Sequence, residues 1–229
     1  MFLDVTHKAR SYLEARFPTI TRLCDRFGLD IASDPIPVRP AAHYHIGGVA
    51  VDADGCTTLQ SLLACGEVAS TGVHGANRLG SNSLLEGLVF GHRAGAAAAR
   101  ACQSMAEAQP LHAIQGLPQE PAYGTLNLAD VDNSLRSLMW RSAGLQRNQA
   151  DLDEALEMVT FWCRYVMDKE FDDPQGWQLQ NALTVARLVV MSARQREESR
   201  GVHYRTDFPE PSENWQRHIV IARSGEEWL

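Results

Sequence analysis

The chain has 229 residues, 45% of them hydrophobic and 21% charged, which is typical of a globular protein that buries a core. Its formal net charge of −7 disfavours a nucleic-acid-binding protein, because phosphate contacts require a basic surface. No apolar run reaches the roughly 18 residues of a membrane-spanning helix, and no secretory signal opens the sequence, so we expect a cytoplasmic protein. The 5 cysteines form no CxxC pair, which argues against a zinc site or a disulfide framework.

Residues 1–37 are expected to contain two short helices and a linker. The first helix covers 6–16 and stops before Pro18, and the second runs from about Thr19 to Phe27. Gly28 then supplies a helix-ending residue. Residues 34–37 contain two prolines and predict an extended linker, because proline restricts both itself and its predecessor.

Residues 38–110 predict short strands followed by one long helix. Strands are expected at 43–46 and 49–51, with a turn at 52–55 that predicts a β-meander. The apolar run 62–65 predicts a buried strand. After a loop at 69–82, a helix is expected from about Leu84 to Ala106, with Ser83 and Glu86 spaced as a capping box.

The remainder predicts a linker at 111–122, a helical domain at 123–199 and an irregular tail at 200–229. Three helices are expected, at 126–147, 150–171 and 175–198, and their short connections favour an antiparallel three-helix bundle. In the tail, a β-like run is expected at 218–221, and Arg200, His203 and Arg205 form either a cationic patch or part of a solvated tail. The predicted fold class is therefore α+β.

Two features between residues 40 and 91 are candidates for binding a nucleotide. Glu67 follows the predicted strand, where a carboxylate commonly accepts a hydrogen bond from a sugar hydroxyl; the alternative is a surface glutamate. Asn82, Ser83 and Leu84 open the long helix, where free N–H groups favour an anion or a polarised carbonyl. The alternative there is ordinary helix capping.

Two further features are candidates for binding a carboxylate. Arg78 lies in a glycine-rich loop, and arginine is suited to hold a carboxylate through two parallel hydrogen bonds; the alternative is a structural ion pair. His43 and His45 flank Tyr44, and strand alternation would place both imidazoles on one face. The alternative is that both histidines are structural donors.

The order and spacing of these features resemble the succinate dehydrogenase/fumarate reductase flavoprotein family, and within it the L-aspartate oxidases. The resemblance rests on three strings: PAAHYHIGGV at 40–49, GEVASTGVHGANRLG at 66–80 and SNSLLE at 81–86. It extends to residues 17–20, 147–148 and 198–209, and so covers nearly the whole chain.

The resemblance implies an enzyme that oxidises L-aspartate to iminoaspartate by hydride transfer to non-covalent FAD, in NAD biosynthesis. In such enzymes Glu67 would bind a sugar-like hydroxyl of FAD, while the helix start at 82–84 would present backbone N–H groups to the pyrimidine edge of the flavin. His43 and Arg78 would hold a carboxylate of the substrate. Oxygen or fumarate would reoxidise the flavin.

The sequence departs from the family pattern in lacking a G-x-G-x-x-G motif, which seats the cofactor's pyrophosphate. The family's capping domain, with its histidine and its proton-transferring arginine, is also missing. We therefore expect the C-terminal portion of such an enzyme: a return segment from the capping domain at 1–37 and the end of the FAD-binding domain at 38–110. The missing N-terminal half would be its partner, and the chain alone would be inactive and bind FAD weakly.

Two alternatives remain open. The chain is either part of a succinate dehydrogenase or fumarate reductase flavoprotein, or a non-catalytic module that pairs with a separate FAD-binding chain.

Overall fold

The computed structural model describes residues 1–104 and 127–222, which include two compact units, Met1–His43 and Tyr44–Leu229. The predicted linker at 111–122 lies outside the described residues. No helix within the described ranges is long and apolar enough to cross a membrane. The same residues contain no cluster of histidine, cysteine and acidic side chains that could hold a metal ion.

The first unit contains two short helices, α1 (Arg10–Arg16) and α2 (Pro18–Arg26). Pro18 starts α2, where its missing N–H removes no intrahelical hydrogen bond. This is why the helix begins one residue earlier than predicted. The helices pack around a small core of three buried side chains, Leu13, Cys24 and Ile31.

The predicted linker of the first unit is partly a strand. Strand β2 (Ile36–Pro37) pairs antiparallel with β1 (Phe2–Leu3) at the start of the chain. Proline lacks an N–H but keeps its carbonyl, so a two-residue edge strand tolerates it. The pairing joins two segments more than thirty residues apart, which local sequence patterns do not indicate.

The second unit opens with two very short strands rather than the predicted β-meander. Strand β3 (Val49–Ala50) pairs parallel with β4 (Ala69–Ser70), and the predicted strand at 43–46 has no strand structure. Gly48, at φ 138°, allows the close approach, because a Cβ atom there would lie 2.2 Å from the carbonyl oxygen of Val68.

The predicted buried strand at 62–65 is wrong. Only Leu63 forms a bridge, antiparallel to Cys56, and Leu62 is 47% exposed. Residues Gly66–Val68 form a 3-10 turn, η1, before β4 begins. A four-residue apolar run does not specify a strand by itself, and here a turn with Ser61 at φ 65° precedes it.

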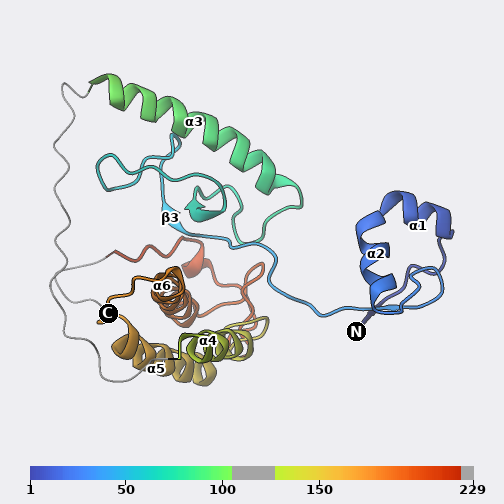
Figure 1. Cartoon of the computed structure of the whole chain (residues 1–229). Coiled ribbons are helices and arrows are strands. Elements are labelled where there is room, and N and C mark those ends of the chain that lie inside the picture. The colour runs from blue at the N-terminus through green and yellow to red at the C-terminus, as the bar shows by residue number, and fades with distance from the viewer. Residues whose placement is uncertain (105–126, 223–229) are drawn as a thin grey trace. The chain divides into compact units, whose positions relative to one another are not determined.

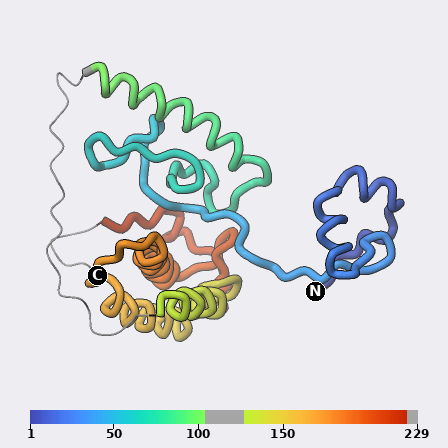
Figure 2. The backbone as a smooth tube through the Cα atoms, viewed as in Figure 1, coloured from blue at the N-terminus to red at the C-terminus, as the bar shows by residue number. Residues whose placement is uncertain are grey.

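Helix α3 (Asn82–Ser104) is long and lies along the loops that precede it (Figures 1 and 2). Its small side chains permit this packing: Ala94 and Ala97 are buried, and Gly55 approaches Ala94 so closely that a Cβ atom would lie 3.0 Å from the alanine Cβ. The helix begins at Asn82, and the predicted capping role of Glu86 is wrong, because the Glu86 carboxylate binds other partners.

Three helices follow in the region where three were predicted: α4 (Leu128–Ser142), α5 (Gln149–Val166) and α6 (Pro174–Gln195). Each begins at a side-chain cap, formed in turn by Asn127, Asn148 and Asp173. The three helices lie close together (Figure 1), and all three contribute to one apolar core. Its most deeply buried side chains are Leu152, Ala155, Val159, Val166, Leu183 and Val190.

The C-terminal segment contains a short 3-10 turn, η2 (Glu213–Trp215), and little other regular structure. The β-like run predicted at 218–221 is wrong, because these residues have no strand structure. Instead, polar groups attach the segment to the helices: Arg205 donates to the carbonyl oxygens of Ala193 and Arg194 in α6, and Asp207 accepts the backbone N–H of Gln149 in α5.

Candidate functional site

A buried carboxylate, Glu86, organises the region that contains most of the predicted site residues. Its side chain is only 1% exposed and accepts hydrogen bonds from Thr71 Oγ1 at 2.5 Å, His74 Nε2 at 2.7 Å and the Tyr44 hydroxyl at 2.9 Å. Burial would raise the pKa of Glu86, but these three hydrogen bonds together hold the pKa below its usual value. Glu86 is therefore an ionised, satisfied group at the centre of this cluster.

Tyr44 joins this carboxylate to Arg78. The Arg78 guanidinium carbon lies 4.8 Å from the centroid of the Tyr44 ring, and the His74 ring meets the same ring edge-on at 5.3 Å. Burial and the neighbouring Glu86 carboxylate raise the pKa of Tyr44, so its phenol remains a donor. We call Tyr44, Thr71, His74, Arg78 and Glu86 the Glu86 cluster.

The Arg78 side chain has few partners of its own. Its Nη1 donates weakly to the neighbouring carbonyl of Leu79 at 3.4 Å, and its buried Nε has no hydrogen-bond partner within the described residues. No carboxylate in the part of the chain that the structure describes forms an ion pair with Arg78. Within the described residues, Arg78 is therefore held against Tyr44 without an ion-pair partner.

The predicted flavin-binding residues lie at the start of α3 and before β4. Asn82 and Ser83 are half-buried at the helix N-terminus, directly after Ser81 at φ 71°, and Leu84 is 76% exposed. The helix is long, so its first N–H groups form a partly positive end. This end fits the electron-rich edge of a flavin.

Glu67 lies in η1 rather than at a strand end, and it is exposed. One carboxylate oxygen, Oε1, accepts the backbone N–H of His45 at 2.8 Å. This bond fixes the carboxylate while Oε2 has no bond from the described residues, so the group suits a hydroxyl donor such as a sugar.

His43 ends the first unit, and its side chain is exposed. His45 is also exposed and contributes its backbone N–H to Glu67. Because residues 43–46 do not form a strand, the alternation that would place both imidazoles on one face does not apply.

The sequence did not identify Glu86, His74 or Thr71 as site residues. One signal was available for Glu86: it lies eight residues before Ala94 and eleven before Ala97, which places all three on one face of a helix. A carboxylate on the buried face of a helix requires partners, and that requirement favours a polar cluster over a cap.

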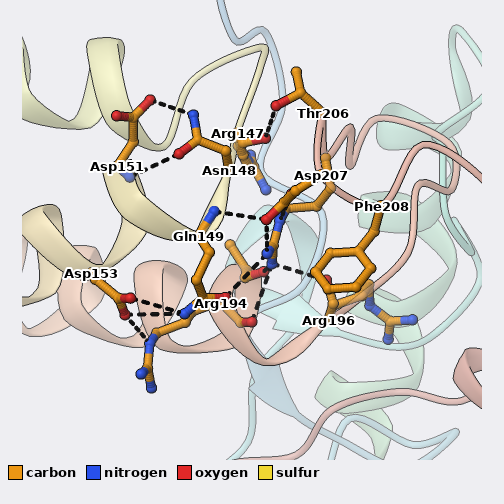
Figure 3. A network of polar contacts seen from close by, with 12 residues as sticks. Arg147, Asn148, Gln149, Asp151, Asp153, Arg194, Arg196, Thr206, Asp207 and Phe208 are labelled. Carbon is orange, nitrogen blue, oxygen red and sulfur yellow. Dashed lines mark hydrogen bonds and ion pairs between the residues drawn. The ribbon is translucent and has the colours of Figure 1, made fainter.

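Arg205 contradicts both predictions made for the C-terminal tail. Its side chain is completely buried and binds the Asp207 carboxylate through two hydrogen bonds of 2.7 Å. The same carboxylate accepts the backbone N–H of Gln149 at the start of α5 (Figure 3). The segment is thus neither a cationic patch nor a solvated tail, because its charges are paired and directed inward.

Two further groups in the segment have strongly shifted pKa values. The Glu198 carboxylate is fully buried, and bonds from Arg200, Ser212 and Arg196 lower its pKa to about 2 despite burial. Burial, Arg147 and other arginines lower the pKa of His203 to about 4, which keeps the imidazole neutral. Arg147 Nη1 then lies 2.9 Å from His203 Nδ1.

This C-terminal segment also contacts the loop that carries Arg78. The Val202 N–H donates to the carbonyl oxygen of Ala76 at 3.1 Å. Gly201, at φ 60°, makes the approach possible, because a Cβ atom there would lie 2.0 Å from the same oxygen. The loop is therefore held from two directions, by the Glu86 cluster and by residues 201–202.

Known proteins match both halves of the chain. Residues 1–84 match the model of the FAD binding domain, and residues 132–228 match that of the fumarate reductase flavoprotein C-terminal region. The chain is 41% identical to an L-aspartate oxidase of Streptomyces coelicolor and 36% identical to a subunit of the fumarate reductase (CoM/CoB) of Methanothermobacter marburgensis, with 96% and 99% of the chain aligned. The chain belongs to the succinate dehydrogenase/fumarate reductase flavoprotein family.

Solved structures agree with this family. The chain superposes on Sdh1 of Mycobacterium smegmatis with a TM-score of 0.76 at 31% identity, and on FrdA of the E. coli quinol fumarate reductase with 0.78 at 29%. These alignments cover 94% and 93% of the chain but 39% and 40% of the solved chains. The chain likewise spans about two fifths of the length of its sequence relatives, 40% and 43%. The match of residues 1–84 to the FAD binding domain identifies FAD as the cofactor.

Proposed function

We propose that the chain is the C-terminal part of a cytoplasmic, FAD-dependent L-aspartate oxidase, in which Arg78 holds a substrate carboxylate. The placement of Arg78 supports this proposal most directly. Its guanidinium lies over the Tyr44 ring and has no carboxylate partner among the described residues. A fixed guanidinium offers a carboxylate two parallel charge-assisted hydrogen bonds. L-aspartate, as a diacid, supplies the complementary group, and L-aspartate oxidases are among the relatives.

In the proposed mechanism, Arg78 binds a carboxylate of L-aspartate and thereby orients its Cα–H bond. Orientation of this kind supplies much of the rate enhancement in reactions between bound partners. Bound FAD would supply the hydride acceptor for the oxidation of L-aspartate to iminoaspartate, with oxygen or fumarate as the final acceptor, and the product would serve NAD biosynthesis.

The residues of α3 and η1 would hold the cofactor. The backbone N–H groups at Asn82, Ser83 and Leu84 would face the pyrimidine edge of the flavin, where a helix N-terminus stabilises developing negative charge. The Oε2 atom of Glu67 would accept a hydrogen bond from a hydroxyl of FAD. These roles use groups that the fold already holds in place.

The test is to co-express this chain with a polypeptide that corresponds to the part of its relatives with which this chain does not align. Aspartate-dependent bleaching of the flavin is then followed in the absence of oxygen. Arg78→Ala should raise the KM for L-aspartate by roughly 10- to 100-fold, which corresponds to about 1.5–3 kcal/mol for hydrogen bonds to a charged group. Arg93→Ala is the control, because Arg93 is exposed and binds the carbonyl of Ala53. Equal effects of the two substitutions would contradict the proposal.

Succinate is the discriminating substrate within the family. Bleaching by succinate but not by L-aspartate would support a succinate dehydrogenase or fumarate reductase flavoprotein instead, in keeping with the fumarate reductase among the relatives.

A second candidate function is supported by the outer face of α3. Leu84, Leu85, Leu88 and Val89 form an apolar stripe, with exposures of 76%, 57%, 72% and 49%. A contiguous exposed apolar stripe favours an interaction surface. A non-catalytic module that pairs with a separate FAD-binding chain would use this face, and it would bind such a chain without supporting turnover.

A further inference from the structure

Among the described residues, the Glu86 carboxylate bonds other groups and forms no ion pair with Arg78. Thr71 donates to its Oε1, and His74 and Tyr44 donate to its Oε2, so its three donors do not include the arginine. A buried carboxylate without such donors would be strongly destabilising and would attract the nearest cation. Because two neutral hydroxyls and an imidazole satisfy it instead, the nearby guanidinium is not drawn into an ion pair.

The Tyr44 ring connects the two charged groups. Glu86 holds the ring at its hydroxyl, His74 packs against it at an interplanar angle of 85°, and Arg78 lies over it. A guanidinium over an aromatic face is attracted by the ring quadrupole, and this attraction holds the Arg78 side chain at the ring. The position of the Arg78 fork therefore depends on where Glu86 holds the phenol.

We infer that Glu86 is a positioning residue that fixes the Arg78 guanidinium through Tyr44, and so sets the preference of the site for a dicarboxylate. The substrate part of this inference rests on the proposed function. Glu86 does not touch the substrate in this scheme. It determines the plane in which the Arg78 guanidinium meets a substrate carboxylate. A neutral amide of a substrate analogue in the same place forms weaker hydrogen bonds with the guanidinium.

The positioning role can be measured in the chain without cofactor or substrate. Side-chain protons of Arg78 that lie over the Tyr44 ring are shifted upfield in the NMR spectrum by the ring current. Glu86→Gln keeps the shape of the side chain but removes its charge, and it should abolish most of that upfield shift. Tyr44→Phe removes only the hydroxyl and should reduce the shift, which keeps the test available if Glu86→Gln does not fold.

Thr71→Val is the matched control for this measurement. It removes one hydrogen bond to Glu86 and leaves the Tyr44 hydroxyl bonded, so the ring-current shift of Arg78 should persist while the chain loses some stability. If Thr71→Val abolishes the shift as completely as Glu86→Gln, Glu86 is only a structural residue and the inference fails. It also fails if Glu86→Gln leaves the shift unchanged.

The substrate part is tested in the co-expressed enzyme by comparing L-aspartate with L-asparagine, its neutral analogue. Glu86→Gln should raise the KM for L-aspartate about tenfold, change kcat much less, and reduce the preference for aspartate over asparagine. An unchanged preference would overturn the specificity role. If the unsubstituted enzyme oxidises neither compound, the proposed function is wrong, and the NMR measurement still decides whether Glu86 positions Arg78.

Discussion

Replacing Gly201 by alanine should destabilise the second unit because three costs coincide at one position. The residue has φ 60°, and a Cβ atom would lie 2.0 Å from the Ala76 oxygen, 2.5 Å from the Ala76 carbonyl carbon and 2.8 Å from its Cβ. The left-handed conformation costs a non-glycine residue about 1–2 kcal/mol. Relieving the clash costs about 1–3 kcal/mol, and losing the hydrogen bond from Val202 adds about 1 kcal/mol.

Gly75→Ala is the matched control, because Gly75 lies in the contacted loop at φ 55° and a Cβ atom there would meet no atom within 4 Å. It should show only the conformational cost, so Gly201→Ala should be less stable than the control by about 2–4 kcal/mol. Urea unfolding followed by tryptophan fluorescence measures the difference, since the described tryptophans, Trp140, Trp162, Trp177 and Trp215, all lie in the second unit. Equal destabilisation by the two substitutions would refute the close contact between the segments.

Three further perturbations test the C-terminal segment and the α3 surface. The pKa of His203 is about 4 in the fold against 6.5 in the unfolded chain, so stability should fall as the pH drops from 6.5 to 4, by on the order of 1–2 kcal/mol after solvent screening; the urea midpoint measures this, and His203→Gln should flatten the dependence. Arg205→Ala should cost about 2–4 kcal/mol in the same assay, because it removes a fully buried guanidinium that bonds the partly exposed Asp207 carboxylate and the carbonyl oxygens of Ala193 and Arg194, and a loss below about 1 kcal/mol would show that these bonds do not stabilise the fold. Leu88→Asp should leave the unfolding midpoint unchanged but weaken co-purification with an FAD-binding partner chain, and unaltered co-purification would exclude this face as the contact.

Apolar residues at helical spacing mark the buried face of the helical domain. Leu152, Val159, Leu183 and Val190 recur at helical spacing, and all are completely buried. Such spacing indicates which face of the helix is buried, because that face packs against the core along the whole length of the helix. The helix ends were less predictable, since they depend on caps such as Asn148.

The strands and the centre of the site could not be predicted by the same means. A two-residue strand such as β3 has no period to detect, and its partner β4 lies twenty residues away. Glu86 has the spacing of a cap, and only its three long-range donors show otherwise. The burial of Arg205 likewise depends on Asp207 and on carbonyl oxygens at the end of α6, which no local pattern reveals.

The segment 198–205 connects the helical domain to the loop that contains Ala76 and Arg78. This connection gives the helical domain a role beyond packing. Arg205 and Glu198 attach the segment to the end of α6, while Gly201 and Val202 contact the loop at Ala76, two residues before Arg78. These buried charges make the segment rigid, because moving Arg205 would leave Asp207 unpaired and moving Glu198 would leave Arg200 unpaired. A rigid segment limits how far the loop can shift, so Arg78, the proposed carboxylate-binding cation, is supported by residues that lie more than a hundred positions later in the chain.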